Sequence, residues 1–123
     1  TRDGMGVELW KNAGFKTMLV SGKSLNLIKD RAKRMGIDYI LLGKKDKYAA
    51  VKEILDKEKI KLEECAYIGD DVNDLPLLRK VGFSASVPDG IEYVKKEVEY
   101  ITKRRGCEGA VRELVDYLLE QKK

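Results

Sequence analysis

The 123-residue sequence is long enough for one domain with a single hydrophobic core, and its 43% hydrophobic and 37% charged residues are typical of a folded globular protein. No apolar run approaches the roughly 20 residues of a membrane span, and the first residues, TRDGMG, lack the basic and apolar regions of a secretory signal. The net charge of +4 comes from scattered basic residues without interleaved aromatics, which argues against nucleic-acid binding and suits a small anionic substrate.

Histidine is absent, and the two cysteines, Cys65 and Cys107, have no spacing that suits a metal site. Two lone thiols are typical of a reducing intracellular setting, so we expect a cytoplasmic protein without a structural disulfide. The absence of histidine also excludes Ser-His and Cys-His nucleophilic schemes. Acid–base chemistry would therefore use carboxylates, lysines or tyrosines.

Short apolar runs alternate with longer amphipathic stretches along the chain. The first run, KTMLVSG, predicts a strand over residues 16–22, and the next segment predicts a helix that Ser24 caps and Gly36 ends. The pattern then predicts, in order, the strand IDYILLG, a helix Asp46–Lys57, the strand CAYIG, a helix from about Val72, the strand FSASV, a helix Glu92–Val98, the strand YIT and a helix Gly109–Gln121.

This alternation decides the expected fold class. Strands that alternate with helices of about ten or more residues indicate right-handed βαβ units and a parallel sheet. The runs MLV and YILL are apolar without alternation, as in strands that helices cover on both faces. We therefore predict a single α/β domain over residues 1–123, an open parallel sheet with helices on both faces.

Polar residues follow three of the predicted strands. Ser21 follows TMLV, the segment that ends at Lys47 follows YILL, and Asp70 and Asp71 follow AYIG. Because ligands of such sheets bind beyond the carboxyl ends of the strands, we expect these residues to converge on one edge. Adjacent carboxylates repel unless a cation lies beside them, and oxygen ligands without histidine or thiolate favour Mg²⁺ over Ca²⁺. Lys47 and Ser21 would then hold an anionic oxygen.

Each of these residues also has a purely structural explanation. The aspartates of GDDVND could cap a helix N-terminus and complement its dipole. A serine after a strand is commonly a cap, and a single Lys47 is commonly a surface residue. The order and the convergence of the three segments favour the functional interpretation.

The segments LVSG, GKKDK and YIGDDVNDLP follow the order of the second, third and fourth motifs of haloacid dehalogenase-like phosphatases, which the chain resembles. More narrowly, TRDGMGVELW, DRAKRMGI, GDDVNDLPLLRKVGFS and YITKRRGCEGAVRELVDYLL resemble the capless phosphatases that act on 3-deoxy-D-manno-octulosonate 8-phosphate. The resemblance covers essentially the whole chain. It implies a Rossmann-like domain without a cap domain, Mg²⁺ as cofactor, a sugar-acid phosphate substrate, and a homotetramer in which neighbouring subunits close the site.

The resemblance also implies roles for individual residues. Ser21 would hydrogen-bond the transferring phosphoryl group, and Lys47 would neutralise it and orient the nucleophile. Asp70 would bind Mg²⁺, whereas Asp71 and Asp74 would fix metal-bound waters and Lys47. The residues implied in substrate binding are Thr1, Arg2, Asp3, Gly4, Lys23, Arg31 and Lys47.

The chain departs from the family pattern in three respects. Lys23 stands where arginine is usual, which weakens a bidentate grip on an anion, and Glu8 stands where a basic residue is common. The family nucleophile, the first aspartate of a DxDG-type motif on the first strand, has no counterpart, and Asp3 is not a substitute. We expect this strand and its hairpin to lie upstream of Thr1, and the 123-residue chain alone to be inactive.

Three other interpretations compete with this one. Phosphatase-like domains of this type also accompany acylneuraminate cytidylyltransferases, where they serve assembly more than catalysis. A two-component receiver domain also combines aspartates, Ser/Thr and lysine around Mg²⁺, but its acidic pair precedes the lysine, whereas Lys47 here precedes Asp70 and Asp71. The third is a plain structural or binding domain.

Overall fold

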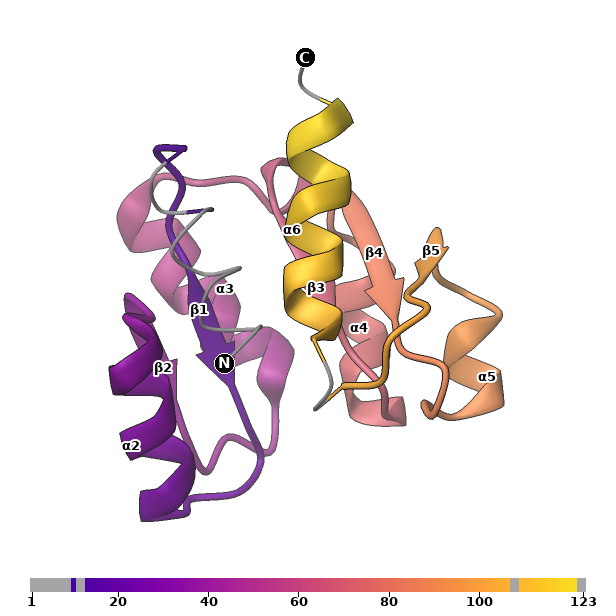
Figure 1. Ribbon diagram of the computed structural model, residues 1–123. Helices are drawn as coiled ribbons and strands as arrows, with labels where there is room; N and C mark the ends of the chain where they lie inside the picture. Colours follow the sequence, from indigo (N-terminus) through magenta and orange to yellow (C-terminus); the bar gives the residue numbers. More distant parts are fainter. Residues whose placement is uncertain (1–9, 11–12, 107–108, 122–123) are drawn as a thin grey trace.

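The computed structural model describes residues 10, 13–106 and 109–121 (Figure 1). Within these residues, no helix combines the length and the apolar character needed to cross a membrane. Single-turn 3₁₀ helices at Leu62–Glu64 and Val72–Asp74 precede the third strand and the fourth helix. The other elements are, in order, β1 (Met18–Val20), α2 (Asn26–Met35), β2 (Tyr39–Leu41), α3 (Lys47–Glu58), β3 (Ala66–Ile68), α4 (Leu75–Leu78), β4 (Phe83–Ser86), α5 (Glu92–Lys95), β5 (Tyr100–Ile101) and α6 (Ala110–Gln121).

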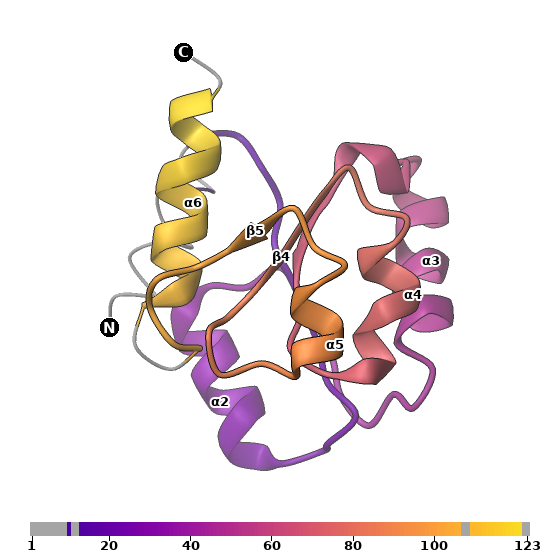
Figure 2. The ribbon, with the colours of Figure 1, turned by 90° about the vertical axis from the view of Figure 1, so that its right-hand side faces the viewer.

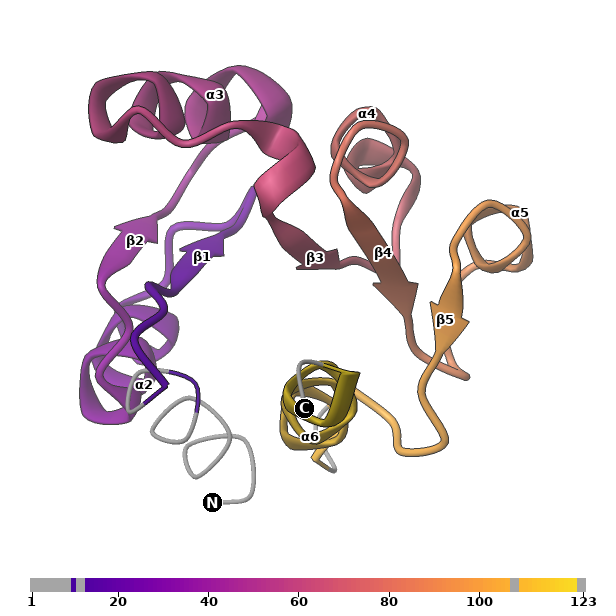
Figure 3. The same ribbon diagram turned by 90° about the horizontal axis from the view of Figure 1, so that it is seen from above.

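The strands are parallel, and helices lie on both sides of them. β1 pairs with β2, with Met18 opposite Tyr39, while a second sheet has the order β3-β4-β5, with Ala66 opposite Phe83. Figure 3 shows α3 and α4 on one side of the strands and α2 and α6 on the other, and Figure 2 shows β4 and β5 between α6 and α4. The predicted fold class, an α/β parallel arrangement, is confirmed, but the described strands form two sheets because β1 and β3 are not paired.

The main core lies between α3 and the strands. Val51 and Leu55, one helical turn apart on α3, pack with Leu62 and Leu77, and all of them are buried. Partly buried side chains of β1 and β3 complete this cluster. The α3 helix begins where the Asp46 carboxylate accepts the Ala49 N–H at 3.0 Å, so the helix start near Asp46 is confirmed.

The two predicted boundaries of α2 have different outcomes. Gly36 ends the helix with a left-handed φ of 78°, and its N–H donates to the Lys33 carbonyl at 3.0 Å, so this prediction is confirmed. The predicted cap at Ser24 is wrong, because the helix begins at Asn26 and the N-cap position is Leu25, without a side-chain cap bond. The residue before Ser24 is instead bonded to the loop after β2, where the Gly43 N–H donates to the Lys23 carbonyl at 3.0 Å.

Candidate active site

The Asp74 carboxylate is the buried centre of the polar residues beyond the strands. Its Oδ1 accepts the Lys47 ammonium at 2.9 Å and the Tyr67 hydroxyl at 2.6 Å. Its Oδ2 accepts the backbone N–H groups of Asp70 at 3.0 Å and Asp71 at 3.1 Å. Asp74 is only 1% exposed, so these four donors replace the water that a carboxylate would otherwise bind.

The surroundings of Asp74 shift two pKa values in opposite directions. Burial by itself raises the pKa of the Asp74 carboxyl, but the hydrogen bonds from Tyr67, Lys47 and the Asp71 amide outweigh burial and lower it below its ordinary value. Burial, the hydrogen bond to Asp74 and the negative charge of that carboxylate raise the pKa of Tyr67 far above its ordinary value. Asp74 is therefore ionised and Tyr67 is a neutral hydrogen-bond donor at neutral pH.

The backbone directly after β3, at Gly69–Asp71, allows the Asp74 side chain to pack close against it. A Cβ atom at Gly69 would lie 2.6 Å from Asp74 Cβ and 2.9 Å from its Oδ2, so only glycine allows this approach. The Asp71 side chain accepts the N–H of Val72 at 2.6 Å and caps the 3₁₀ helix. Asp71 and Asp74 thus have structural roles here, as the capping interpretation requires, beside the catalytic roles predicted for them.

Asp70 differs from the other two aspartates. Its side chain is exposed at the strand end, and within the described part of the chain its carboxylate makes no hydrogen bond or ion pair. The backbone N–H of Asp70 binds Asp74, which fixes the main chain beneath the free carboxylate. Asp70 is therefore the aspartate of GDDVND whose oxygens are available to a ligand.

Lys47 and Ser21, the predicted site residues after β2 and β1, differ in how directly they are connected to Asp74. Lys47 is the first residue of α3, and its side chain is only 12% exposed. The Ser21 carbonyl accepts the Lys44 N–H at 2.9 Å, which ties the end of β1 to the loop that leads to Lys47. The Ser21 hydroxyl accepts the Lys23 N–H at 3.1 Å. Lys47 and Asp74 are thus in contact, and Ser21 is joined to them through one loop.

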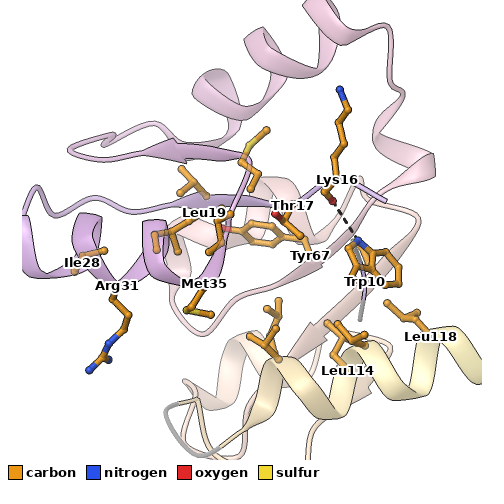
Figure 4. A pocket seen from close by; sticks show the side chains of 18 of the residues that line it. Trp10, Lys16, Thr17, Leu19, Ile28, Arg31, Met35, Tyr67, Leu114 and Leu118 are labelled. Atoms are coloured by element: carbon orange, nitrogen blue, oxygen red, sulfur yellow. Dashed lines mark hydrogen bonds between the residues drawn. The ribbon is translucent and has the colours of Figure 1, made fainter. Parts of the chain in front are cut away.

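The predicted substrate-binding residues are spread more widely. The side chains of Lys23 and Arg31 are exposed, and Figure 4 shows Arg31 pointing away from the interior from its position on α2. No described contact brings either of them to Lys47 or Asp74. The predicted residues Thr1, Arg2, Asp3 and Gly4 lie outside the described residues.

Two residues of this region had no predicted role. Tyr67 is the second donor to Asp74 Oδ1, and the available signal was a tyrosine two positions before Gly69 in an otherwise aliphatic strand. Ser86, at the end of β4, is fully buried, and its hydroxyl has no hydrogen-bond partner in the described structure. A Cβ at Gly90 would lie 2.8 Å from Ser86 Oγ and 3.4 Å from Asp70 Cβ, so Ser86 lies behind the Asp70 turn.

The possible metal ligands at this edge suit a hard cation, but they do not complete a coordination sphere. The available side-chain ligand atoms are oxygens, chiefly those of the Asp70 carboxylate, and such oxygens favour Mg²⁺ or a similar ion. Among the residues that the structure describes, no three His, Cys, Asp or Glu side chains are grouped to hold a metal. The described residues therefore offer one part of a coordination sphere, with Asp70 as its carboxylate.

Comparison with known proteins agrees with this geometry. The family model of haloacid dehalogenase-like hydrolases matches residues 31–114. The chain is 35% identical over 118 residues to the 3-deoxy-D-manno-octulosonate 8-phosphate phosphatase KdsC of Escherichia coli strain K12. These aligned residues make up 96% of this chain and 63% of that protein. The chain thus spans less than two thirds of the length of this curated relative.

Solved structures give the same result. The phosphatase from Moraxella catarrhalis, solved in complex with magnesium ion, phosphate ion and 3-deoxy-D-manno-octulosonate (KDO), is 39% identical with a TM-score of 0.93, over 97% of this chain and 68% of that one. The cobalt-bound phosphatase from Haemophilus influenzae is 33% identical with a TM-score of 0.91, over 98% and 70% of the two chains. The chain belongs to the haloacid dehalogenase-like hydrolase family.

Proposed function

We propose that this chain is the metal- and phosphate-binding part of a Mg²⁺-dependent phosphomonoesterase that acts on a sugar-acid phosphate such as 3-deoxy-D-manno-octulosonate 8-phosphate. The observation that carries this proposal is the nearly buried Lys47–Asp74 pair beside the free carboxylate of Asp70. The similarity to a phosphatase solved with magnesium ion, phosphate ion and KDO supports the substrate class.

Some of these residues would bind the cation and others would bind the phosphate. Asp70 would supply the one direct carboxylate ligand that this chain gives to Mg²⁺, and Asp71 would hold its waters. Lys47, oriented by Asp74 at 2.9 Å, presents a fixed positive charge to the phosphoryl oxygens, and the Ser21 hydroxyl would bind one of them. Mg²⁺, when bound, compensates the negative charge that builds up on the transferring phosphoryl group.

The nucleophile is proposed to come from outside these 123 residues. No DxD sequence occurs in the chain, and the aspartates of GDDVND are used for the turn and for the cation. An aspartate upstream of Thr1 would attack phosphorus as the bond from phosphorus to the sugar oxygen breaks, and the sugar oxygen would leave as a hydroxyl after taking up a proton. Water would then hydrolyse the aspartyl-phosphate to inorganic phosphate and restore the carboxylate. The domain would accordingly extend beyond residues 1–123 by a strand and a hairpin.

The substrate-binding residues and the assembly belong to the same proposal. Lys23 and Arg31, together with Thr1–Gly4, would contact the sugar acid or its phosphate. A site without a cap domain needs another cover, and a neighbouring subunit of a cytoplasmic homotetramer would supply it. Sedimentation of the intact protein tests this assembly, and a monomer with full activity would exclude it.

Metal titration and phosphate release test the function itself. In the intact protein, Asp70→Asn should weaken Mg²⁺ binding by at least about tenfold, which corresponds to about 1.4 kcal/mol. The matched control is Asp116→Asn, at an exposed position of α6, which should leave Mg²⁺ binding unchanged. Lys47→Ala should abolish most hydrolysis of the octulosonate phosphate. Equal Mg²⁺ affinity of wild type and Asp70→Asn would refute the ligand assignment.

A further inference from the structure

Ser86, the last residue of β4, carries a buried hydroxyl without a partner. The residue is fully buried, and its Oγ makes no hydrogen bond within the described part of the chain. Buried hydroxyls are normally hydrogen-bonded, because an unpaired one has lost water without gaining another partner. The Ser86 main chain is held in the sheet, where its carbonyl accepts the Thr102 N–H at 3.0 Å. The hydroxyl therefore stays at the carboxyl end of β4, beside the end of β3 that leads to Asp70.

Gly90 leaves a small space that Ser86 and Asp70 share. A Cβ atom at Gly90 would lie 2.8 Å from Ser86 Oγ and 3.4 Å from Asp70 Cβ, so a single methyl position touches both side chains. The φ of Gly90 is not positive, so this angle does not itself require glycine. The absence of a side chain at Gly90 thus keeps the path between the Ser86 hydroxyl and the Asp70 side chain open.

The loop over residues 87–91 fixes the main chain on both sides of this space. The Ile91 N–H donates to the Asp70 carbonyl at 3.1 Å, which joins the loop to the turn after β3. The Lys95 ammonium of α5 donates to the Pro88 carbonyl at 2.8 Å, and its side chain is partly buried. The separation of the β4 end from the Asp70 main chain is therefore set by hydrogen bonds, while the Asp70 carboxylate itself can still turn about its side-chain bonds.

Asp70 lacks what a metal-binding carboxylate usually has. Its side chain is exposed, and among the residues that the structure describes its carboxylate has neither a hydrogen bond nor an ion pair. Carboxylates that bind a metal are normally held by a further hydrogen bond, and loss of that bond commonly weakens metal binding by about 10- to 100-fold. A hydroxyl suits this role because it is a neutral donor and does not repel the cation. Ser86 has a free donor, and Asp70 has free acceptors.

We propose that Ser86 is a positioning residue for the metal site, whose hydroxyl donates a hydrogen bond to the Asp70 carboxylate across the space at Gly90 when Mg²⁺ is bound. This inference rests on the proposed function for the assignment of Asp70 as the Mg²⁺ ligand. Ser86 itself touches neither the cation nor the substrate. Its unpaired hydroxyl lowers the stability of the metal-free protein, and it raises the affinity for Mg²⁺ by holding the carboxylate in the binding orientation.

Calorimetric titration of the intact protein with Mg²⁺ tests this role directly. Ser86→Ala should weaken Mg²⁺ binding by about tenfold. The matched control is Ser84→Ala, the same substitution on the same strand, because the Ser84 hydroxyl is also buried but accepts the Glu99 N–H at 3.1 Å. Ser84→Ala should leave the Mg²⁺ affinity unchanged. An equal loss of affinity in the two variants, or no loss in Ser86→Ala, would overturn the inference.

Gly90→Ala blocks the shared space while the hydroxyl remains. The new methyl group would meet Ser86 Oγ at 2.8 Å and stand between it and Asp70, so Mg²⁺ binding should again weaken by about tenfold. The double variant Ser86→Ala/Gly90→Ala should bind Mg²⁺ no more weakly than Gly90→Ala, because both substitutions remove the same hydrogen bond. Losses that multiply in the double variant would contradict the shared contact.

Asp70→Asn separates this inference from the proposed function. If Asp70→Asn leaves the Mg²⁺ affinity of the intact protein unchanged, the ligand assignment fails, and the role of Ser86 fails with it. If Asp70→Asn weakens binding and Ser86→Ala does not, the positioning role alone is overturned. Stability gives a second readout: in urea unfolding, the gain in stability on adding Mg²⁺ should be smaller for Ser86→Ala than for wild type and Ser84→Ala. An equal gain in all three proteins would overturn the inference.

Discussion

Lys47 and Asp74 are 27 positions apart in the sequence, yet their side chains form an ion pair of 2.9 Å that is almost closed to solvent. Lys47 begins the helix after β2, and Asp74 ends the 3₁₀ helix after β3, so the pair joins two segments that follow strands of the two separate sheets. The site and the fold therefore depend on the same contact. Any change that weakens it should be visible in stability as well as in phosphate chemistry.

Replacement of the cation is the simplest test of this contact. Lys47→Met should lower the free energy of unfolding by about 3 kcal/mol, the lower end for a broken buried pair, because Asp74 loses its positive partner but keeps three hydrogen-bond donors. The control is Lys52→Met, which breaks a solvent-screened pair with Asp56 and should change the stability little. Urea unfolding measures both variants. Equal losses would mean that the Lys47–Asp74 pair behaves as a surface pair.

The lowered pKa of Asp74 predicts a pH dependence of stability. The carboxyl binds its proton less readily in the folded than in the unfolded chain, so its contribution is fully present above the unfolded pKa of about 3.9. That contribution is lost as the pH falls through the folded pKa. The free energy of unfolding should accordingly decrease on acidification below about pH 4. NMR titration of the Asp74 carboxyl carbon should give a midpoint below the pKa of the unfolded chain.

Tyr67→Phe isolates the part of this dependence that belongs to Asp74. The substitution removes the hydroxyl that donates to Asp74 at 2.6 Å, so the pKa of the folded carboxyl should rise and its acid-dependent contribution should shrink. Tyr93→Phe, at a position that is 59% exposed, is the control and should leave the Asp74 titration unchanged. An unchanged midpoint in Tyr67→Phe would show that the hydroxyl does not stabilise the charge.

Gly69→Ala tests the close approach beneath the turn. The new methyl group would meet Asp74 Cβ at 2.6 Å, so Asp74 must move away from the amides of Asp70 and Asp71. We expect a loss of about 1–3 kcal/mol in the free energy of unfolding. Gly22→Ala is the matched control, because its methyl group would have only an ordinary contact of 3.7 Å with the Lys44 carbonyl and should be nearly neutral. Similar losses in the two variants would contradict the packing argument.

The parts of the structure that could be predicted from the sequence are those set by local patterns. The alternation of apolar runs and amphipathic stretches indicated the parallel α/β class, and Gly36 marked a helix end through its backbone freedom. The Ser24 prediction was wrong because the helix begins one residue later than the local pattern indicates, with Leu25 at the N-cap position, and the hydrogen bond from the Gly43 N–H to the Lys23 carbonyl is a long-range contact that no local pattern contains. Tyr67 was missed because a tyrosine in an otherwise aliphatic strand marks the position but not its partner, and the hydrogen bond to Asp74 depends on how the chain folds after β3.

The buried hydroxyl of Ser86 leads to the last prediction. Ser86 is 0% exposed, and its Oγ has no hydrogen-bond partner in the described structure, although its carbonyl accepts the Thr102 N–H at 3.0 Å. An unsatisfied buried hydroxyl costs about 1–3 kcal/mol, so Ser86→Ala should raise the free energy of unfolding by about 1 kcal/mol, since the small cavity it leaves offsets part of the gain. Ser84→Ala is the control, because the Ser84 hydroxyl accepts the Glu99 N–H at 3.1 Å, and its removal should destabilise the protein. Urea unfolding distinguishes the two signs, and destabilisation by both substitutions would show that the Ser86 hydroxyl is satisfied in solution.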